Sequence, residues 1–278
     1  MAGRRVRLDA ELVRRGLAGA RAEAQRLIAE GRVTVDGAPA AKATAQVAPA
    51  QAVVVLPGQR QWASRAAYKL LGALDRFAID VAGRHCLDAG ASTGGFTDVL
   101  LSRGAAGVVA VDVGYGQLLW RLREDPRVVV LDRTNVRALV PEQVPPPPPT
   151  LVVADLSFIS LTLVLPALRA VAARGADFVL MVKPQFEAGR DHVGSGGVVR
   201  DPEGWRAAMA RVIDTGEAAG LALCGVAPSP LPGPSGNVEF FVWLAEGTAV
   251  AREPAIETAV AEGTVLVARA SDPAPEDE

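Results

Sequence analysis

Short apolar runs alternate with helical stretches along most of the chain. The runs that predict strands are His85–Ala89, Gly107–Asp112, Val128–Asp132, Leu151–Asp155 and Asp177–Lys183. Their richness in β-branched residues is typical of strands that are buried on both faces of a parallel sheet. Two later runs, Leu221–Val226 and Val238–Leu244, predict a terminal pair joined by a hairpin-like reversal. We therefore expect an α/β fold whose main sheet is doubly wound and has seven strands.

The beginning of the chain has a different pattern and predicts a small α+β unit. Two short helices are expected, the first capped by Asp9 and ended by Gly16, the second ended by Gly31. Val33–Val35 then alternates into Asp36-Gly37, which is a strong signal for a β-hairpin. A compact N-terminal domain separate from the main sheet follows from this pattern.

Breaks in the pattern divide the chain further. Pro57-Gly58 marks a boundary, and the short segment after it carries Trp62, which either pins the two domains together or stacks on a base. The acidic end, Ser271–Glu278, is expected to be disordered. The predicted divisions are residues 1–58, a linker 59–64, a large domain 65–248 and a partly disordered C-terminal extension 249–278.

Charge is distributed unevenly along the chain. Residues 1–70 hold 12 Lys and Arg against 5 Asp and Glu, a net +7, so the net charge of −2 for the whole chain leaves −9 on the rest. A basic head on an acidic body indicates a polyanionic partner for the head. The alternative is an arginine-rich helix pair that is merely well solvated.

Several classes of protein are disfavoured by composition. The two cysteines, Cys86 and Cys224, lie far apart in apolar runs and suggest buried thiols, with neither a disulfide framework nor a metal site. No apolar signal-peptide core follows Met1, so the cytoplasm is the expected compartment. The apolar stretch Leu151–Leu168 does not read as a membrane span, because Asp155 and a proline interrupt it.

A glycine-rich turn follows the first strand of the large domain. Its residues are Asp88, Gly90, Ala91, Ser92, Thr93, Gly94 and Gly95, and such a turn lets backbone N–H groups approach a ligand closely. The dinucleotide fingerprint requires glycine where Ser92 stands, which favours S-adenosylmethionine over a nicotinamide cofactor. Asp112 is placed to accept hydrogen bonds from ribose hydroxyls, and Asp132 either accepts an adenine amine or is a solvated acid.

Four charged residues at strand ends or helix starts suggest the chemistry. They are Lys69, Asp155, Lys183 and Glu239. Because ligands bind beyond the carboxyl ends of strands in open α/β sheets, Asp155 and Lys183 are expected to converge on one crevice. A ribose hydroxyl must lose its proton as it attacks a methyl group, and a lysine whose surroundings favour its neutral form can accept or steer that proton. The alternative is a purely structural salt bridge between Asp155 and Lys183.

Two loops are candidates for covering a substrate. Glu187–Pro202 is long and rich in glycine, as expected of a loop that closes over a bound molecule. Pro228–Asn237 is rich in proline and precedes Glu239, so it either positions that acid or contacts RNA.

Together these motifs resemble the TlyA family of ribosomal RNA 2′-O-methyltransferases, which is also known under the name hemolysin. The head resembles the RNA-binding domain first seen in ribosomal protein S-four, through Arg14-Arg15-Gly16-Leu17 and Val33–Gly37, although Ala20 stands where that domain usually has serine. The body resembles the FtsJ-type methyltransferases, whose Lys-Asp-Lys-Glu tetrad corresponds to Lys69, Asp155, Lys183 and Glu239.

The resemblance implies a Rossmann-like methyltransferase sheet and S-adenosylmethionine as cofactor. It also implies 2′-O-methylation of cytidine in 16S and 23S ribosomal RNA, with ribosomal RNA or ribosomal subunits as partners and no stable membrane association. The basic residues expected to contact RNA phosphates are Arg4, Arg5, Arg7, Arg14, Arg15, Arg21 and Lys42.

Three other functions remain open at this stage. A membrane-acting hemolysin is disfavoured by the lack of a span, an export signal or a long basic amphipathic helix. A non-catalytic RNA chaperone on the same fold is disfavoured by the intact tetrad. Methyl transfer to a protein or a small molecule would leave the basic head without a purpose.

Overall fold

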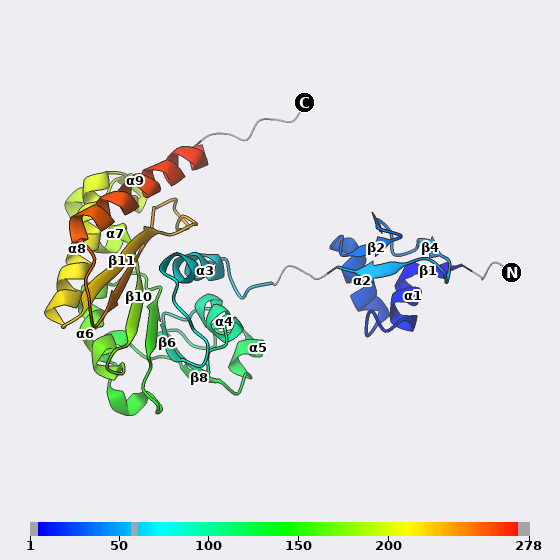
Figure 1. The fold of residues 1–278 in the computed structure, drawn as a ribbon, viewed down its shortest axis with the longest axis horizontal. Helices are drawn as coiled ribbons and strands as arrows, with labels where there is room; N and C mark the ends of the chain where they lie inside the picture. Colours follow the sequence, from blue (N-terminus) through cyan, green and yellow to red (C-terminus); the bar gives the residue numbers. More distant parts are fainter. Residues whose placement is uncertain (1–4, 57–60, 272–278) are drawn as a thin grey trace. The chain divides into compact units, whose positions relative to one another are not determined.

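The computed structural model describes residues 5–56 and 61–271. The chain forms two compact units, Met1–Gln61 and Trp62–Glu278. Arg4, Pro57-Gly58 and the end of the acidic tail after Ser271 lie outside the described residues. Figure 1 shows the secondary structure of each unit.

The N-terminal unit is a small α+β body. Its elements are β1 (Val6–Arg7), α1 (Leu8–Arg14), α2 (Arg21–Ala29), β2 (Val33–Val35), β3 (Ala38–Pro39), β4 (Gln46–Val47) and β5 (Val53–Val55). β1 pairs with β4, and β2 pairs with both β3 and β5, all antiparallel. The predicted hairpin is confirmed: Asp36 and Gly37 form the turn between β2 and β3 with φ of +50° and +83°. One apolar core, which includes Leu8, Leu12 and Leu27, joins the helices to these strands.

The role predicted for Asp9 is wrong. α1 begins one residue earlier, at Leu8, and Arg7 occupies the N-cap position without a side-chain cap. The Asp9 carboxylate is fully buried and receives hydrogen bonds from Arg7, Arg21 and Gln25. These partners, two of them in α2, bind the carboxylate inside the unit and leave it in the first turn of the helix rather than ahead of it.

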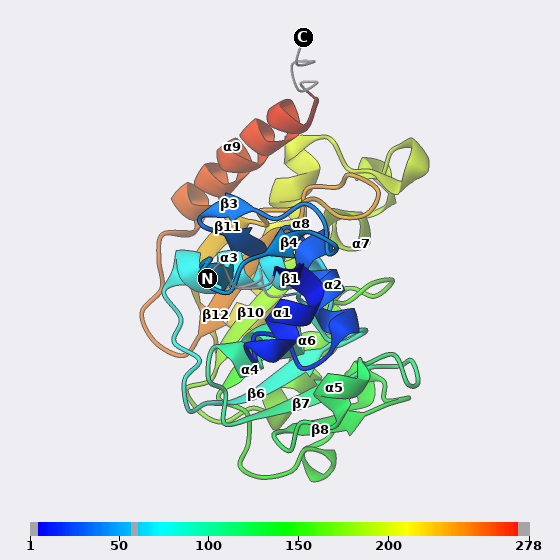
Figure 2. The same ribbon diagram turned by 90° about the vertical axis from the view of Figure 1, so that its right-hand side faces the viewer.

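The second unit is built on a seven-stranded sheet in the order β11-β12-β10-β9-β6-β7-β8. The strands are β6 (His85–Ala89), β7 (Gly107–Val111), β8 (Val128–Leu131), β9 (Leu151–Ala154), β10 (Asp177–Val182), β11 (Ala222–Pro228) and β12 (Phe240–Ala245). β12 is antiparallel to both β10 and β11, whereas the pairs from β10 to β8 are parallel. Figure 2 follows the sheet from β12 and β10 through β6 to β8. The predicted sheet is confirmed, including the reversed terminal pair.

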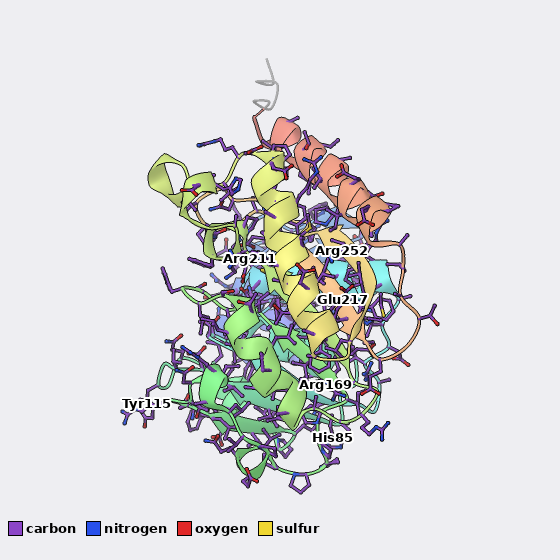
Figure 3. The ribbon with its side chains drawn as sticks, turned by 90° about the vertical axis from the view of Figure 1, so that its left-hand side faces the viewer. His85, Tyr115, Arg169, Arg211, Glu217 and Arg252 are labelled. Atoms are coloured by element: carbon purple, nitrogen blue, oxygen red, sulfur yellow. The ribbon has the colours of Figure 1, made fainter. Side chains whose placement is uncertain are left out.

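Helices cover both faces of this sheet. They are α3 (Ala66–Phe77), α4 (Gly95–Ser102), α5 (Trp120–Arg123), α6 (Leu161–Val171), α7 (Pro184–Glu187), α8 (Pro202–Ala218) and α9 (Arg252–Ser271), with short 3-10 turns η1 (Val136–Ala138), η2 (Pro141–Gln143), η3 (Arg190–His192) and η4 (Ser195–Gly197). Successive strand residues point to opposite faces. In β10, Phe178, Leu180 and Val182 therefore pack with α6, α8 and α9, whereas Val179 and Met181 pack with α3 and α4. Figure 3 views the face that these first three helices cover, with Arg169 of α6, Arg211 of α8 and Arg252 of α9 labelled.

Helix α9 occupies most of the C-terminal extension and was not predicted. Ile256, Ala259 and Val260 are buried against the sheet, and Gly263 leaves room for the ring of Phe240. At its start, Arg252 pairs with Asp214 of α8 at 2.6 Å. The extension is thus part of the second unit as far as Ser271.

The apolar stretch once considered as a span divides into β9 and the start of α6. Within residues 5–56 and 61–271, no helix combines the length and the hydropathy needed to cross a bilayer.

Candidate cofactor and substrate site

The glycine-rich turn connects β6 to α4 and has a fixed shape. Gly90 and Gly94 have φ of +88° and +100°, and Ser92 also has a positive φ, +47°. A Cβ at Gly90 would lie 2.6 Å from the backbone oxygen of Asp155, so only glycine fits between these two strand ends. The turn therefore brings β6 and β9 close together at the carboxyl edge of the sheet.

Two cavities open beside this turn in the described part of the chain. The first, of about 210 Å³, is lined by Ser64, Ala66, Gly90, Ala91, Ser92, Thr93, Gly95, Phe96, Asp155, Ser157 and Lys183. The second, of about 370 Å³, is lined by Gly90, Ser92, Asp112, Val113, Gln117, Val136, Asp155, Leu156, Ser157 and Phe158. They share Gly90, Ser92, Asp155 and Ser157, so an extended ligand can occupy both.

Asp112 belongs to the wall of the larger cavity. Its carboxylate accepts hydrogen bonds from the backbone N–H of Ser92 at 2.8 Å and of Gly114 at 2.7 Å. These bonds orient the acid, and each carboxylate oxygen retains a second lone pair for a ligand hydroxyl. Asp112 thus stands where the sequence placed a ribose-binding acid.

Asp132 has a different environment. Its carboxylate accepts from Arg123 at 2.7 Å and from the N–H of Gly116 at 3.3 Å, and it is not among the residues that line these two cavities. Its visible role is to order the segment that follows Asp112.

Asp88 lies behind the turn and is fully buried. Thr97 donates a hydrogen bond to its Oδ2 at 2.7 Å, whereas Oδ1 is buried without a hydrogen-bond partner. Burial raises the pKa of Asp88 to about 7, although the bond from Thr97 opposes this rise. Asp88 is in the wall of neither cavity, so it supports the turn from behind, whereas Asp112 and the turn residues face the space for a ligand.

The four charged residues form two buried pairs. Lys183, which follows β10, has its Nζ 2.6 Å from Asp155 Oδ1 and donates to Ser157 Oγ at 2.9 Å. Lys69, in α3, donates from Nζ to Glu239 Oε2 at 2.5 Å. Both lysines and Glu239 are buried. The structure therefore brings together residues that are up to 170 positions apart in the chain.

A third cavity, of about 380 Å³, connects the two pairs. It is lined by Ser157, Phe158, Lys183, Gln185, Phe186, Val193, Gly196, Gly197, Pro234, Ser235, Asn237 and Glu239. Because Lys183 also lines the 210 Å³ cavity, its side chain stands at the junction between the space beside the glycine-rich turn and a second space.

Aromatic residues that sequence reasoning missed shape this third cavity. Phe158 is 91% exposed and has φ of +64°, an unusual conformation for a large side chain. Its ring lies 5.4 Å from the ring of Phe186, centroid to centroid. Nothing in the sequence announces such exposure, because it depends on the backbone of the loop after β9.

The two predicted covering loops are tied to each other. Asn237 is buried, its Oδ1 accepts from the N–H of Val199 at 2.9 Å, and its Nδ2 donates to the carbonyl of Gly197 at 3.0 Å. Since Asn237 lies two residues before Glu239, these bonds attach the glycine-rich loop to the segment that carries the acid. His192 of that loop lies 3.8 Å from Asp201, at the start of α8.

Glu187 joins the loops that bear Asp155 and Lys183. It accepts from the Ser160 hydroxyl at 2.5 Å and from the N–H of Leu161 at 2.6 Å, at the start of α6. Burial raises the pKa of Glu187, while these two donors oppose the rise. The carboxyl thus binds the beginning of α6 to the end of α7.

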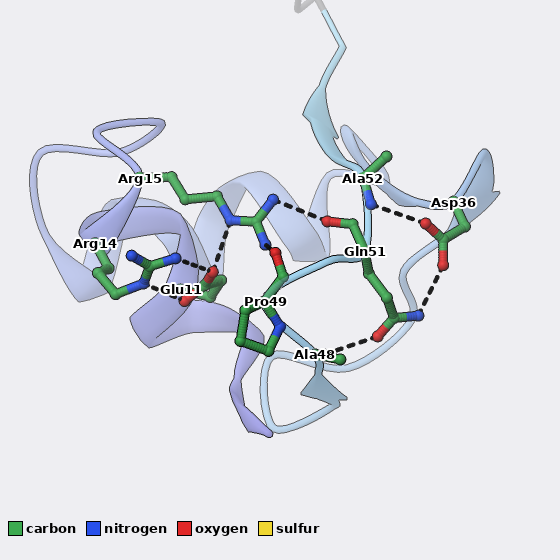
Figure 4. Close-up of polar contacts among 8 residues, drawn as sticks. All are labelled: Glu11, Arg14, Arg15, Asp36, Ala48, Pro49, Gln51 and Ala52. Atoms are coloured by element: carbon green, nitrogen blue, oxygen red, sulfur yellow. Dashed lines mark hydrogen bonds and ion pairs between the residues drawn. The ribbon is translucent and has the colours of Figure 1, made fainter. Parts of the chain in front are cut away.

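In the N-terminal unit, the buried acid Glu11 gathers two of the predicted RNA-binding arginines (Figure 4). Arg14 and Arg15 lie 2.6 and 2.7 Å from its Oε1, and Arg14 is the largest cause that lowers the pKa of Glu11 to about 2. Arg15 also donates to the carbonyls of Gln51 and Pro49, and its side chain is only 20% exposed. Arg15 is therefore committed to contacts within the unit.

The other basic residues of the head differ in how far their side chains are exposed and paired with acids. Arg7 and Arg21 pair with Asp9 at 2.8 and 3.2 Å but remain partly exposed. Arg5 and Lys42 are exposed. Arg4 lies outside the described residues.

Comparison with known proteins gives two family matches. The model of the FtsJ-like methyltransferase matches residues 62–246, and that of the S4 domain matches residues 6–51.

Relatives match over most of their length. The chain is 57% identical over 94% of its length to the 16S/23S rRNA (cytidine-2′-O)-methyltransferase TlyA of Mycobacterium tuberculosis, of which it covers 99%. It is 36% identical over 84% of its length to Hemolysin A of Brachyspira hyodysenteriae, of which it covers 98%. A solved structure described as a hemolysin from Streptococcus thermophilus is 34% identical, with a TM-score of 0.73 over 97% of this chain and 99% of that one.

Proposed function

The chain belongs to the TlyA family of FtsJ-like methyltransferases, and on that premise we propose that it methylates the 2′-hydroxyl of cytidine in 16S and 23S ribosomal RNA. The observation that carries this proposal is the position of Lys183 between the cofactor cavities and the third cavity. A side chain there can contact a methyl donor on one side and a ribose on the other. We propose the cytoplasm, where ribosomal RNA is found, as the place of action.

The residues around the glycine-rich turn fit S-adenosylmethionine. Gly90 to Thr93 and Gly95 would hold it at the turn, with Asp88 buried behind them, and Asp112 would bind its ribose hydroxyls. When bound, this cofactor supplies a methyl group on a positively charged sulfur. Asp132, which accepts from Arg123 and Gly116, is not among the residues that line the two cavities beside the turn.

The tetrad handles the proton of the attacking hydroxyl. As a free amine, Lys183 would accept a hydrogen bond from the 2′-hydroxyl and take up its proton, and the bound cofactor would supply the methyl group. Asp155, 2.6 Å from Nζ, then stabilises the ammonium that results, and Ser157 fixes the direction of the side chain.

Lys69 and Glu239 complete the wall on the substrate side. Lys69 occupies Oε2 of Glu239, while Oε1 is covered beside Gly233 without a hydrogen-bond partner and would turn toward the cavity to accept from a ribose hydroxyl. The pair therefore orients the sugar, and Lys69 keeps a buried carboxylate neutralised.

The N-terminal unit binds the phosphate backbone of the RNA. Arg5 and Lys42 offer exposed charges, and Arg7, Arg14 and Arg21 contribute where they extend beyond Asp9 and Glu11. Arg15 holds the unit together instead. We propose residues 1–58 as the RNA-binding domain, 59–64 as linker and 65–248 as the catalytic domain, with α9 of the extension packed on it. Phosphate contacts position RNA without reading its sequence.

The test is transfer of label from radiolabelled S-adenosylmethionine to isolated ribosomal subunits, followed by alkaline hydrolysis of the RNA. Label in alkali-resistant dinucleotides is expected with the wild type and none with Lys183→Ala. Arg174→Ala is the matched control, because Arg174 is exposed just before β10, at the opposite edge of the sheet. Label in single nucleotides would mean base methylation and refute the proposal, as would full activity of Lys183→Ala.

A further inference from the structure

We propose that Gln185 reads the base of the target nucleotide, by accepting a hydrogen bond from the exocyclic amine of cytosine. The inference rests on the proposed ribose methylation and concerns the 380 Å³ cavity next to Lys183. It assigns a role to a side chain that the methyl-transfer chemistry does not use.

The position of the base follows from the chemistry of the sugar. The 2′-carbon is bonded to the 1′-carbon, which carries the base, so a ribose with its 2′-oxygen at Lys183 places the base in the adjoining space. The third cavity is that space, because Lys183 and Glu239 both belong to its wall. Its volume is in the range of small-molecule sites. A base can enter it only after leaving its stack in the RNA.

The walls suit a flat ring. Phe158 and Phe186 contribute aromatic faces, and Phe158 is held outward by a left-handed backbone. Stacking on such faces binds any base, because every base has a π-face. The aromatic residues therefore explain retention of a base but not the choice of cytosine.

The polar groups of the cavity are mostly committed elsewhere. Asn237 uses its amide on Gly197 and Val199, and Ser157 accepts from Lys183. By contrast, Oε1 of Gln185 is buried with no hydrogen-bond partner. That oxygen has almost no accessible surface in the free protein, so the amide must turn toward the cavity to accept from a ligand N–H group, and the cost of leaving a buried carbonyl unpaired favours this turn.

The location of Gln185 couples recognition to chemistry. It lies in α7, two residues after Lys183, and Glu187 fixes the same short helix to the start of α6. An amide bound to the base edge thus sets the distance from the sugar to Lys183. Gln185 is a specificity-determining residue under this proposal, and it takes no part in proton transfer.

Cytosine and uracil differ at the edge that the amide would meet. Cytosine has an amine donor beside the acceptor N3, whereas uracil has a carbonyl acceptor beside N3–H. With Oε1 turned to the base amine as acceptor and the amide nitrogen as donor to N3, Gln185 matches cytosine at both atoms. Uracil would place an oxygen against Oε1.

The experiment compares full-length wild type with Gln185→Met, which keeps the length of the side chain and removes the amide. Substrates are ribosomal subunits that carry either the natural target cytidine or uridine at that position. Gln143→Met is the matched control, since Gln143 is an exposed glutamine in η2 of the same unit. The readouts are kcat/KM for alkali-resistant label on each substrate and the dissociation constant of S-adenosylmethionine by calorimetry.

We expect Gln185→Met to lower kcat/KM on cytidine by about tenfold to a hundredfold and to bring the cytidine-to-uridine ratio close to one. Affinity for S-adenosylmethionine should not change, which also shows that the variant is folded. If Gln185→Met does not fold, Gln185→Asn, which withdraws the amide by one methylene, should give the same loss of discrimination.

A variant that methylates but keeps the wild-type ratio would overturn the base-reading role alone. A wild type that places no label on ribose would instead refute the proposed function on which this inference rests.

Discussion

Replacing Lys69 by methionine tests how the buried Lys69–Glu239 pair is balanced. The side chains are 6% and 1% exposed, so the substitution leaves Glu239 as a buried carboxylate without its cation. Breaking such a pair by removing one partner costs about 3–5 kcal/mol. In a unit of this size 1 kcal/mol corresponds to roughly 2–4 °C in melting temperature. We therefore expect the second unit of Lys69→Met to melt about 6–20 °C below that of the wild type.

The double variant Lys69→Met/Glu239→Gln separates stability from catalysis. With the unpaired charge removed, it should regain most of the lost melting temperature and still fail to methylate RNA. The assay is thermal unfolding followed by circular dichroism, beside transfer of label. Arg174→Met serves as control, because Arg174 is an exposed cation of the same unit. If Lys69→Met melts within 2 °C of the wild type, or if the double variant is no more stable than the single one, the reasoning about this pair fails.

Three further outcomes follow from the structure. Burial raises the pKa of Asp88 to about 7, so the folded protein keeps a proton there that the unfolded chain loses near pH 4. The stability of the protein therefore falls as pH rises from about 4 to about 7. Asp88→Asn should melt at a higher temperature than the wild type at pH 8 but not at pH 4, and an equal difference in melting temperature at the two pH values would contradict this. Replacing Arg5 and Lys42 by alanine should weaken RNA binding and reduce the salt slope of log K by about 0.7–0.9 per lost phosphate contact, whereas an unchanged slope in filter-binding titrations would remove them from the interface. Glu187→Ala removes the carboxylate that accepts from the Ser160 hydroxyl and from the N–H of Leu161 at the start of α6, so it should cost about 1–2 kcal/mol of stability and lower kcat. Glu187→Gln should retain most of the stability and most of the turnover. Equal losses in the two variants, measured by unfolding and turnover assays, would argue against a role for these hydrogen bonds.

The main sheet could be predicted because its strands carry their signal locally. The runs from His85 to Lys183 are continuous and apolar, and a polar residue follows each of the last four strands of the parallel set. The prediction extended those strands by one residue, since Asp112, Asp132, Asp155 and Lys183 begin the loops instead. This error is small, and it leaves the acids and the lysine at the edge where ligands bind.

Other features depend on contacts between distant segments. Asp9 has the residue type and position of a helix cap, yet partners in α2 and at Arg7 bind it inside the unit. Likewise, the unpartnered carbonyl of Gln185 and the outward ring of Phe158 exist only once the cavity has formed. Helix α9 is a different case: Ile256, Ala259, Val260 and Gly263 follow helical spacing, so a closer reading of the periodicity would have found it.

The pairing of Lys69 with Glu239 has a consequence for the synthesis of the chain on the ribosome. The two residues are 170 positions apart, and the acid comes just before the final strand of the sheet. At about 5–20 residues per second of synthesis, roughly 10–35 s pass between the appearance of the lysine and that of its partner. A growing chain can complete its small head early, and therefore hold RNA, long before it possesses a working centre. The complete tetrad therefore cannot exist on a nascent chain until almost the whole sheet has been synthesised.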